Sequence, residues 1–298
     1  MQDSARPEII GHGDISPIGH GDVSPIGHGD VSPISDAAGS RPSVSVIIPA
    51  MNEAKNLPYV AFRMPEGIDQ IVFVDGNSAD DTVAVARKLW PEATFVTQTR
   101  SGKGNALACG IEACTGDIIV TIDADGSTDP AEIPLFVQAL VEGADLAKGS
   151  RFVGAGGSTD ITALRRIGNK ALNTIVNVYF HTKFTDLCYG YNAFWARHAE
   201  QIELPPTGYR RAQWGDGFEI ETVINVRLAT AGLRITEVGS FEGPRLHGRS
   251  NLNAYSDGMR VLRTINQEFK HWRSHRSATR HGVRAGAAIE LASDELAG

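Results

Sequence analysis

Short β-branched strands that alternate with helical segments place the strongest constraint on how this chain of 298 residues can fold. Four strands are predicted early in the chain, at Ser43–Ile48, Ile71–Val74, Thr94–Thr97 and Asp117–Ile122. Helical spacing is present in Asp80–Leu89 and Lys103–Ala113, and a further helix is expected after Pro130. Because parallel strands need crossover helices between them, this order predicts a three-layer α/β sandwich with a mainly parallel central sheet.

The second half of the chain has a less regular pattern. Long helices are predicted at Ala163–Phe180, Phe218–Ala231 and Ala254–Trp272, and a strand at Leu233–Val238. Residues 11–34 are three tandem octapeptides, GHGDISPI, GHGDVSPI and GHGDVSPI, whose glycines, prolines and few apolar positions cannot build a core. We therefore predict a disordered tail over 1–41, one folded domain over 42–273, and a loosely ordered tail, first basic and then acidic, over 274–298.

Composition excludes several classes of protein. The net charge is −7 and the pI is about 5.7, which argues against a protein that neutralises many nucleic-acid phosphates. Three scattered cysteines cannot form a disulfide framework and indicate reduced thiols. No stretch approaches the roughly 18 apolar residues of a membrane span, and the N-terminus lacks a secretory signal. A cytoplasmic protein is expected.

Polar residues follow three of the predicted strands. Asn52 and Glu53 come just after Pro49 at the end of the first strand, Asp75 ends the second, and the fourth leads into Asp123-Ala124-Asp125. Open parallel sheets bind ligands at the carboxyl ends of their strands. Each group alone could cap a helix or close a turn, but three in the right order on one sheet predict a ligand site.

The two carboxylates of Asp123 and Asp125 suit a hard cation. Mg²⁺ or Mn²⁺ is typically held by one or two carboxylates together with substrate phosphates. A cation at this turn would bridge a diphosphate and stabilise the charge on a departing nucleoside diphosphate. The Gly102-Lys103-Gly104 segment, which opens a predicted helix, adds a lysine where anions are favoured and glycines that permit close approach of a ligand.

In this order the segments VSVIIPAMNEAKNL, IVFVDGNSADDT, RSGKGNALACGIEACTGDIIVTIDADG and AKGSRF resemble the inverting family 2 glycosyltransferases of the GT-A fold. Within that family the likeness is to the dolichol- and polyprenyl-phosphate sugar synthases. It covers roughly Ser43 to Asn253 and is strongest up to Arg151. It implies a nucleotide-diphospho-sugar donor, a divalent metal, and transfer with inversion.

The resemblance also implies roles for individual residues. Pro49, Asn52, Glu53 and Asp75 would hold the nucleoside. Lys103 and Asp123 would contact the donor, and Asp123 and Asp125 would face the metal. Near the acceptor or the diphosphate it implies a larger set, made of Arg151, Arg165, Asp186, Arg245 and Arg249, with Asp125, Asp186 and Arg249 as the catalytic residues.

Two departures from the family pattern bear on the donor. The second strand ends in VDGNS, where the family usually has two aspartates, so one expected nucleoside contact is missing. Ser127 stands where the lipid-phosphate synthases often carry a glutamine beside the metal. Both changes leave the identity of the nucleotide and of the sugar open.

The acceptor decides the mechanism. A lipid phosphate is already anionic, so it would need positioning and charge neutralisation, which arginines supply. A hydroxyl acceptor would need a base, for which Asp186 or Glu219 are candidates, although Asp186 could instead brace a loop and Glu219 and Glu221 could form a solvated helix face. Transfer to a polyprenyl or dolichyl phosphate is the preferred prediction. A transferase for a soluble hydroxyl acceptor and a non-catalytic nucleotide-sugar-binding module are the alternatives.

Two further classes fit the motifs less well. A phosphatase of the haloacid-dehalogenase type would place DADGST on its first strand, whereas here three strands precede it. A calcium loop fails because Thr128 and Pro134 occupy positions that require Gly and Glu. A lipid acceptor would also require contact with a bilayer, which the basic run 270–284 or the helix at 163–180 could provide at a membrane surface. The preferred interpretation of these two segments is a solubilising charge run and an ordinary core helix.

Overall fold

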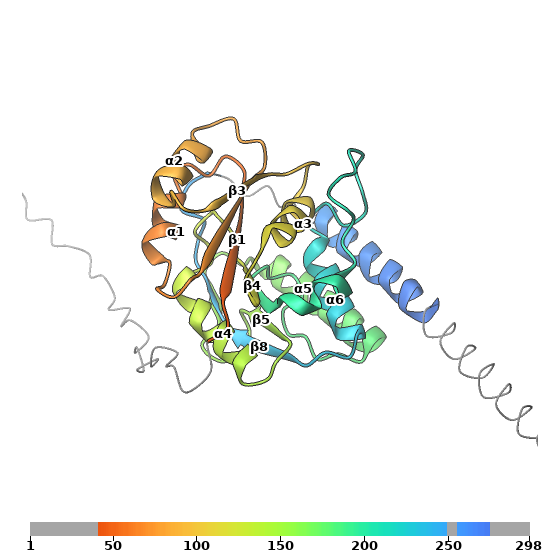
Figure 1. The fold of residues 1–298 in the computed structure, drawn as a ribbon. Coiled ribbons are helices and arrows are strands. Elements are labelled where there is room, and N and C mark those ends of the chain that lie inside the picture. The colour runs from red at the N-terminus through yellow and green to blue at the C-terminus, as the bar shows by residue number, and fades with distance from the viewer. Residues whose placement is uncertain (1–40, 249–254, 275–298) are drawn as a thin grey trace, which may run out of the picture. The chain divides into compact units, whose positions relative to one another are not determined.

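The structure is a computed structural model that describes residues 41–248 and 255–274. The predicted repeat tail, most of the predicted C-terminal tail and Arg249 lie outside the described residues. Seven strands form one sheet in the order β3-β2-β1-β4-β7-β5-β8 (Figure 1). Their bounds are β1 Val44–Ala50, β2 Gln70–Asp75, β3 Thr94–Thr97, β4 Ile118–Thr121, β5 Leu146–Ser150, β7 Asn192–Trp195 and β8 Ile235–Gly239. A small second sheet pairs β6, Gly157–Ser158, with β9, Phe241–Glu242.

The large sheet is mainly parallel, as the alternation of strands and helices predicted. β1 pairs in parallel with β2 on one side and with β4 on the other, and β5 is parallel to β8. β7 is the exception, because it lies antiparallel between β4 and β5. The sheet therefore consists of two parallel halves joined through one antiparallel strand.

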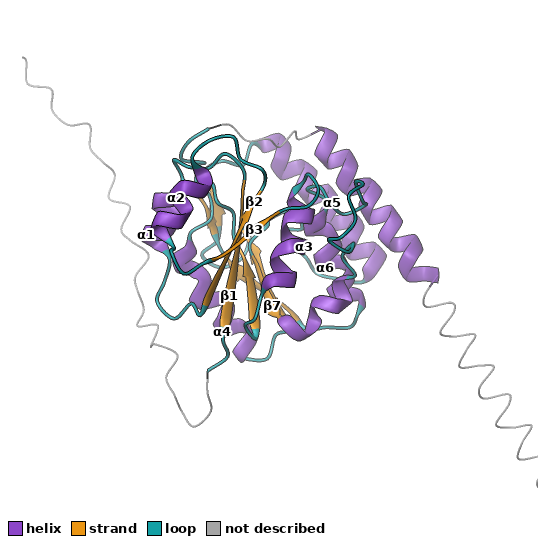
Figure 2. Ribbon diagram, turned by 45° about the horizontal axis from the view of Figure 1, so that its top comes forward, coloured by secondary structure: helices purple, strands orange, loops and turns teal. Residues whose placement is uncertain are grey.

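Helices cover both faces of the sheet (Figure 2). One face is covered by α1, α2 and α4, and the other by α3 and α6, with α5 packed outside α6. Their bounds are α1 Leu57–Arg63, α2 Thr82–Leu89, α3 Lys103–Ala113, α4 Ile133–Val141, α5 Ala163–Phe180 and α6 Ile220–Thr230. Two 3₁₀ turns, Pro130–Glu132 and Ala196–Ile202, add to these, and residues 255–274 are helical.

Alternation along the strands explains the three layers. In β1, Val46 and Ile48 face the α1/α2/α4 side, whereas Ile47 faces α3 and α6. All three are completely buried, so β1 is apolar on both faces, as expected of a central strand in a parallel sheet. The same division in β2 and β4 produces one apolar layer on each side of the sheet.

Several elements lacked a sequence signal strong enough to predict them. Helix α1 has only seven residues, which is too short to display a helical period. Strand β5 has the sequence LAKGS, and all five of its residues are buried, including Lys148. The ammonium of Lys148 donates to the carbonyl oxygens of Gly149 (2.8 Å) and Tyr189 (2.5 Å), which explains how a lysine is accommodated in the core. Its burial lowers the pKa of Lys148.

Among the helices that the structure describes, none combines the length and the apolar character needed to cross a bilayer. The longest labelled helix, α5, has 18 residues but carries Arg165, Arg166 and Lys170 within it.

The stacking of Phe136 on Tyr191 offers a test of the packing of α4 on the sheet. Both side chains are fully buried and their ring centroids are 4.2 Å apart. Phe136→Ala should lower the free energy of unfolding by about 3–5 kcal/mol, because it removes a large buried ring and leaves a cavity. Urea denaturation measures this, with Val141→Ala on the exposed side of α4 as the control. Equal stability of the two variants would contradict the packing.

Candidate active site

The candidate site lies at the carboxyl ends of β1, β2 and β4. From β1 the chain moves outward to β2 and β3, and then returns through α3 to β4 on the other side of β1. Strand order thus reverses between β1 and β4, which is where open α/β sheets bind their ligands. A cavity of about 600 Å³ opens there, lined by the ends of β1 and β4 and by α3, α5, α6 and the helix at 255–274.

The turn after β4 contributes both of its aspartates to the cavity lining. Their side chains remain partly open to solvent, at 33% for Asp123 and 20% for Asp125. One oxygen of Asp125 accepts hydrogen bonds from the backbone N–H of Ser127 (2.9 Å) and from its hydroxyl (2.7 Å). Ser127, which replaces the glutamine of the family pattern, therefore orients Asp125.

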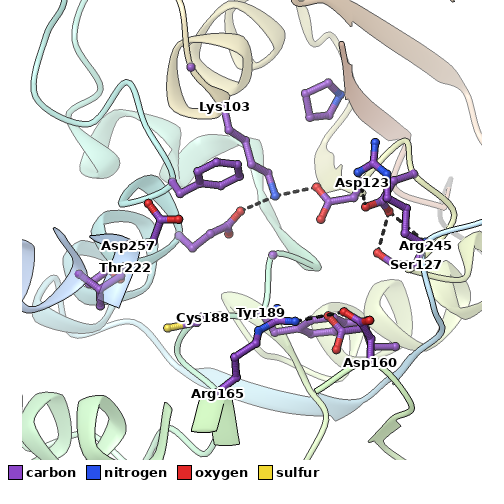
Figure 3. A pocket seen from close by; sticks show the side chains of 18 of the residues that line it. Lys103, Asp123, Ser127, Asp160, Arg165, Cys188, Tyr189, Thr222, Arg245 and Asp257 are labelled. Atoms are coloured by element: carbon purple, nitrogen blue, oxygen red, sulfur yellow. Dashed lines mark hydrogen bonds and ion pairs between the residues drawn. The ribbon is translucent and has the colours of Figure 1, made fainter. Parts of the chain in front are cut away.

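Lys103 bridges two carboxylates of the cavity (Figure 3). Its Nζ lies 2.6 Å from Asp123 Oδ1 and 2.8 Å from Glu221 Oε1 on α6. Burial opposes the positive charge, but the attraction of the two carboxylates outweighs it and raises the pKa of Lys103 above its usual value. Lys103 is therefore a permanent cation beside Asp123, at the N-terminus of α3.

The two glycines that flank Lys103 admit the protein's own backbone. A Cβ on Gly102 would lie 2.1 Å from the carbonyl oxygen of Asp216, and one on Gly104 would lie 1.7 Å from that of Gly215. Gly104 N–H donates to the Asp216 carbonyl (2.7 Å), and the Asp216 carboxylate is paired with buried Arg100 at 2.8 Å. The sequence predicted that these glycines admit a ligand, whereas in the structure the atoms close to them belong to the 215–216 turn, which fixes the start of α3.

Arg245 links the end of β1 to the turn after β4. Its Nη1 lies 3.1 Å from Asp125 Oδ2, and its Nη2 forms an ion pair with Glu53. Burial raises the pKa of Glu53, and the partners Asn56 and Arg245 offset only part of that effect. The segment that carries Arg245 is also hydrogen-bonded to the turn after β4, since Gly243 N–H donates to the carbonyl of Ser127 (2.8 Å).

Arg151 forms the second basic centre of the cavity. Two of its nitrogens bind Asp186, at 2.7 and 2.9 Å, and its Nη1 binds Glu242 at 2.9 Å. Its guanidinium also lies over the ring of Tyr189, 5.0 Å from the ring centre. Desolvation opposes the charge, but the two carboxylates outweigh it and raise the pKa of Arg151. Its orientation is therefore fixed before any ligand binds.

Most of the predicted site residues meet in this one cavity. Its lining includes Pro49, Glu53, Lys103, Asp123, Asp125, Arg151, Arg165 and Arg245. Arg165 Nη1 pairs with Asp160 at 3.0 Å. Asn52 and Asp75 do not line the cavity. They accept hydrogen bonds from the loop after β2: Asn52 Oδ1 accepts from Ala79 N–H (2.8 Å), and Asp75 Oδ1 accepts from Ser78 N–H (3.2 Å). Arg249 lies outside the described residues.

Asp186 and the two glutamates of α6 differ from expectation. Asp186 is fully buried behind Arg151, and a third donor, Asn169 Nδ2, binds it at 2.9 Å, so it braces Arg151 and does not face the cavity. Glu219 and Glu221 are only 6% and 5% exposed, so the prediction that they form a solvated helix face is wrong. Glu219 accepts from the N–H groups of Gly215 and Gly217 (3.2 Å each), whereas Glu221 faces Lys103.

Several residues that line the cavity were not predicted from the sequence, among them Glu221, Glu242 and Tyr189. Glu221 and Glu242 each neutralise a basic residue of the site, and Tyr189 packs beneath Arg151. Their signal in the sequence is weak, because a glutamate in a helix and a tyrosine in a loop have many ordinary roles.

Asp123 and Asp125 are the residues that fit a divalent metal. Over the described ranges, 41–248 and 255–274, no three His, Cys, Asp or Glu side chains are placed to share one ion. Two partly exposed carboxylates at the cavity agree with Mg²⁺ or Mn²⁺, which leave their other positions to water and substrate phosphates. Lys103 and Arg245 neutralise these carboxylates in this structure.

A cavity at the carboxyl ends of a mainly parallel sheet places the chain among the α/β proteins that bind a ligand at this edge. Comparison with known proteins identifies the family. Residues 45–202, more than half of the chain, match the model of glycosyl transferase family 2. A glycosyltransferase of Mycobacterium tuberculosis is 33% identical over 211 residues, which cover 71% of this chain and 90% of that protein. The chain therefore belongs to glycosyl transferase family 2, as its motifs implied.

Relatives with described acceptors are also found. A polyprenol monophosphomannose synthase of Mycolicibacterium smegmatis is 33% identical over 215 residues, covering 68% of this chain and 79% of that protein. Among solved structures, glucosyl-3-phosphoglycerate synthase from Mycobacterium tuberculosis, in complex with Mn²⁺, UDP-glucose and phosphoglyceric acid, aligns with a TM-score of 0.59 at 22% identity. That alignment covers 77% of this chain and 80% of the other, and it confirms the fold.

Two of the aspartate–arginine pairs at the cavity, Asp186–Arg151 and Asp160–Arg165, should contribute very differently to the stability of the fold. Asp186→Asn should cost about 3 kcal/mol, because it leaves the buried Arg151 without half of its charge partners. Asp160→Asn should cost at most about 1 kcal/mol, since Asp160 and Arg165 are partly exposed. Chemical denaturation of the two variants measures the difference, and similar losses would contradict the structural role of Asp186.

Proposed function

We propose that this protein is an inverting, metal-dependent glycosyltransferase that moves a sugar from a nucleotide-diphospho-sugar to a polyprenyl or dolichyl phosphate. The observation that carries the proposal is the pairing of charges in the cavity. Among the described lining residues, Lys103, Arg151, Arg165 and Arg245 each contact a carboxylate that lines the same cavity. These four basic residues are the cations that would contact the diphosphate of the donor and the phosphate of the acceptor.

We propose that the nucleotide sugar binds at the ends of β1 and β4. Glu53 and Pro49 line the part of the cavity next to Gly76, which follows β2, where a nucleoside would lie. Asp123 and Asp125 would hold Mg²⁺ or Mn²⁺, which when bound supplies positive charge to the diphosphate leaving group. Lys103 and Arg245, which already contact these aspartates, would stabilise the same leaving group after the carbon–oxygen bond of the donor breaks.

The acceptor side favours a group that attacks without losing a proton to the enzyme. The carboxylates that line the described cavity are those of Glu53, Asp123, Asp125, Asp160, Glu221, Glu242 and Asp257, and each lies within 4.0 Å of a Lys or Arg nitrogen. Asp186 and Glu219, the candidates for a base, lie outside the lining. An anionic phosphate oxygen needs positioning rather than a base, and Arg165 and Arg151 offer it.

The proposal draws on relatives as well. The polyprenol monophosphomannose synthase of Mycolicibacterium smegmatis and a dolichol-phosphate mannosyltransferase of Pyrococcus furiosus carry lipid-linked acceptors in their names. Glucosyl-3-phosphoglycerate synthase, which shares the fold, was crystallised with phosphoglyceric acid, so a soluble acceptor is the alternative class. Both kinds of acceptor carry a phosphate, and the experiment must separate them.

Asp125→Ala tests the donor site. We expect the wild-type protein to turn over at least one nucleotide sugar in the presence of Mn²⁺ or Mg²⁺, and the variant to be slower by about 100-fold or more, because a metal ligand and a partner of Arg245 are lost together. A panel of nucleotide sugars with polyprenyl phosphate, analysed for glycolipid, measures this.

Asp81→Ala is the matched control, since Asp81 is exposed before α2 and its side chain makes no capping hydrogen bond. It should retain full turnover. Failure of the wild-type protein to bind any nucleotide sugar with metal would contradict the proposed function. Turnover of a soluble acceptor with no lipid product would instead assign the alternative acceptor class.

A further inference from the structure

We propose that the outward face of α5 docks the protein on an anionic phospholipid surface, beside the mouth of the cavity. The inference rests on the proposed function, because a membrane surface is where a polyprenyl phosphate is found. It assigns the membrane contact to a helix whose inner face is packed against the domain, whereas most of the basic run at 270–284 lies outside the described residues.

The outward face of α5 exposes large apolar side chains. Leu164, Ile167 and Val178 are 73%, 68% and 66% exposed, although Val176 and Phe180 of the same helix are buried in the core. The exposed positions follow a helical stripe that also contains Ala171 and Thr174. An α-helix that is already anchored on its inner face gains nothing in stability from such a second apolar stripe, whereas an interfacial helix uses it to enter the headgroup region.

Charge on α5 matches an anionic partner. Arg166 and Lys170 are exposed between the apolar positions, and the helix from Ala163 to Phe180 contains no acidic residue. This is opposite in sign to the whole chain, whose net charge is −7. Basic residues that flank apolar ones on a helix are attracted to the negative surface potential of anionic lipids. The same basic residues would repel each other across a symmetric dimer, which disfavours a second copy as the partner.

The docking face is continuous with the cavity. Leu164 is 73% exposed and also lines the cavity, as does Tyr255, which is 82% exposed. Farther inside, Ile161, Leu172 and Val261 contribute apolar side chains to the same wall. Arg165, next to Leu164, points into the cavity (Figure 3). A lipid phosphate could therefore place its headgroup at Arg165 and keep its chain against apolar side chains that lead to the bilayer.

Vesicle co-sedimentation of the full chain tests the docking face. We expect the protein to bind phosphatidylglycerol-containing vesicles more tightly than pure phosphatidylcholine vesicles, with binding that weakens in salt. Ile167→Glu/Val178→Glu should lower the bound fraction at limiting lipid by about tenfold or more, because two apolar side chains at the interface become charged. Neither residue lines the cavity.

The matched control is Phe62→Glu/Val141→Glu, which changes two apolar residues that are 85% and 53% exposed on α1 and α4. It should bind vesicles as the wild type does. Equal binding by the α5 variant and this control, or no binding by the wild type to anionic vesicles, would overturn the proposal. So would a wild-type dimer that the α5 variant converts to monomers, since the face would then join two copies.

Activity separates this inference from the proposed function. The α5 variant should keep metal-dependent turnover with a short, water-soluble prenyl phosphate and lose most of its turnover with a long-chain polyprenyl phosphate in anionic vesicles. Loss of both activities in the α5 variant alone would place α5 in the active site and overturn the docking role. If the wild type turns over neither acceptor but binds vesicles through α5, the proposed acceptor class fails and the docking face stands.

Discussion

The site depends on the partly buried ammonium group of Lys103. Lys103 brings together the start of α3, the turn after β4 and the first turn of α6, since its Nζ contacts both Asp123 and Glu221. A buried cation without such partners would carry a large desolvation cost, so each of the three elements holds the others in place. Gly190 completes the arrangement, because a Cβ at that position would lie 2.7 Å from both Lys103 Nζ and Glu221 Oε1.

A similar principle orders the other side of the cavity. Arg151 is fixed by Asp186 and Glu242, and Arg245 by Glu53 and Asp125, so the basic groups have defined orientations in the absence of substrate. Prearranged charges of this kind lose little freedom when a phosphate binds, which makes them effective at stabilising a leaving group. The carboxylates thus serve two purposes, as partners of cations and as ligands for the proposed metal.

Much of the fold and of the donor side could be predicted from sequence. The apolar β-branched runs of β1, β2 and β4 identified a parallel sheet, and the polar residues predicted after β1 and β4 include Glu53, Asp123 and Asp125, which line the cavity. Strands β5 and β7 could not be predicted, because LAKGS and NAFW derive their strand structure from neighbours on both sides rather than from local propensity. The partners of Arg151 and Lys103 were equally hidden, since an ion pair between positions such as 103 and 221 leaves no local pattern in the sequence.

The antiparallel strand β7 has a consequence for how the chain is assembled during synthesis. β7 lies between β4 and β5 in the sheet. The segment 146–150 therefore cannot join the strands β1 to β4 until residues 192–195 have left the ribosome. The unit formed by β1 to β4 can pair its strands earlier, because the β1–β2, β2–β3 and β1–β4 pairings all lie before residue 122. Synthesis from the N-terminus therefore favours early folding of the β1–β4 half of the sheet, with the half that contains β5 and β8 added as a later and separate step.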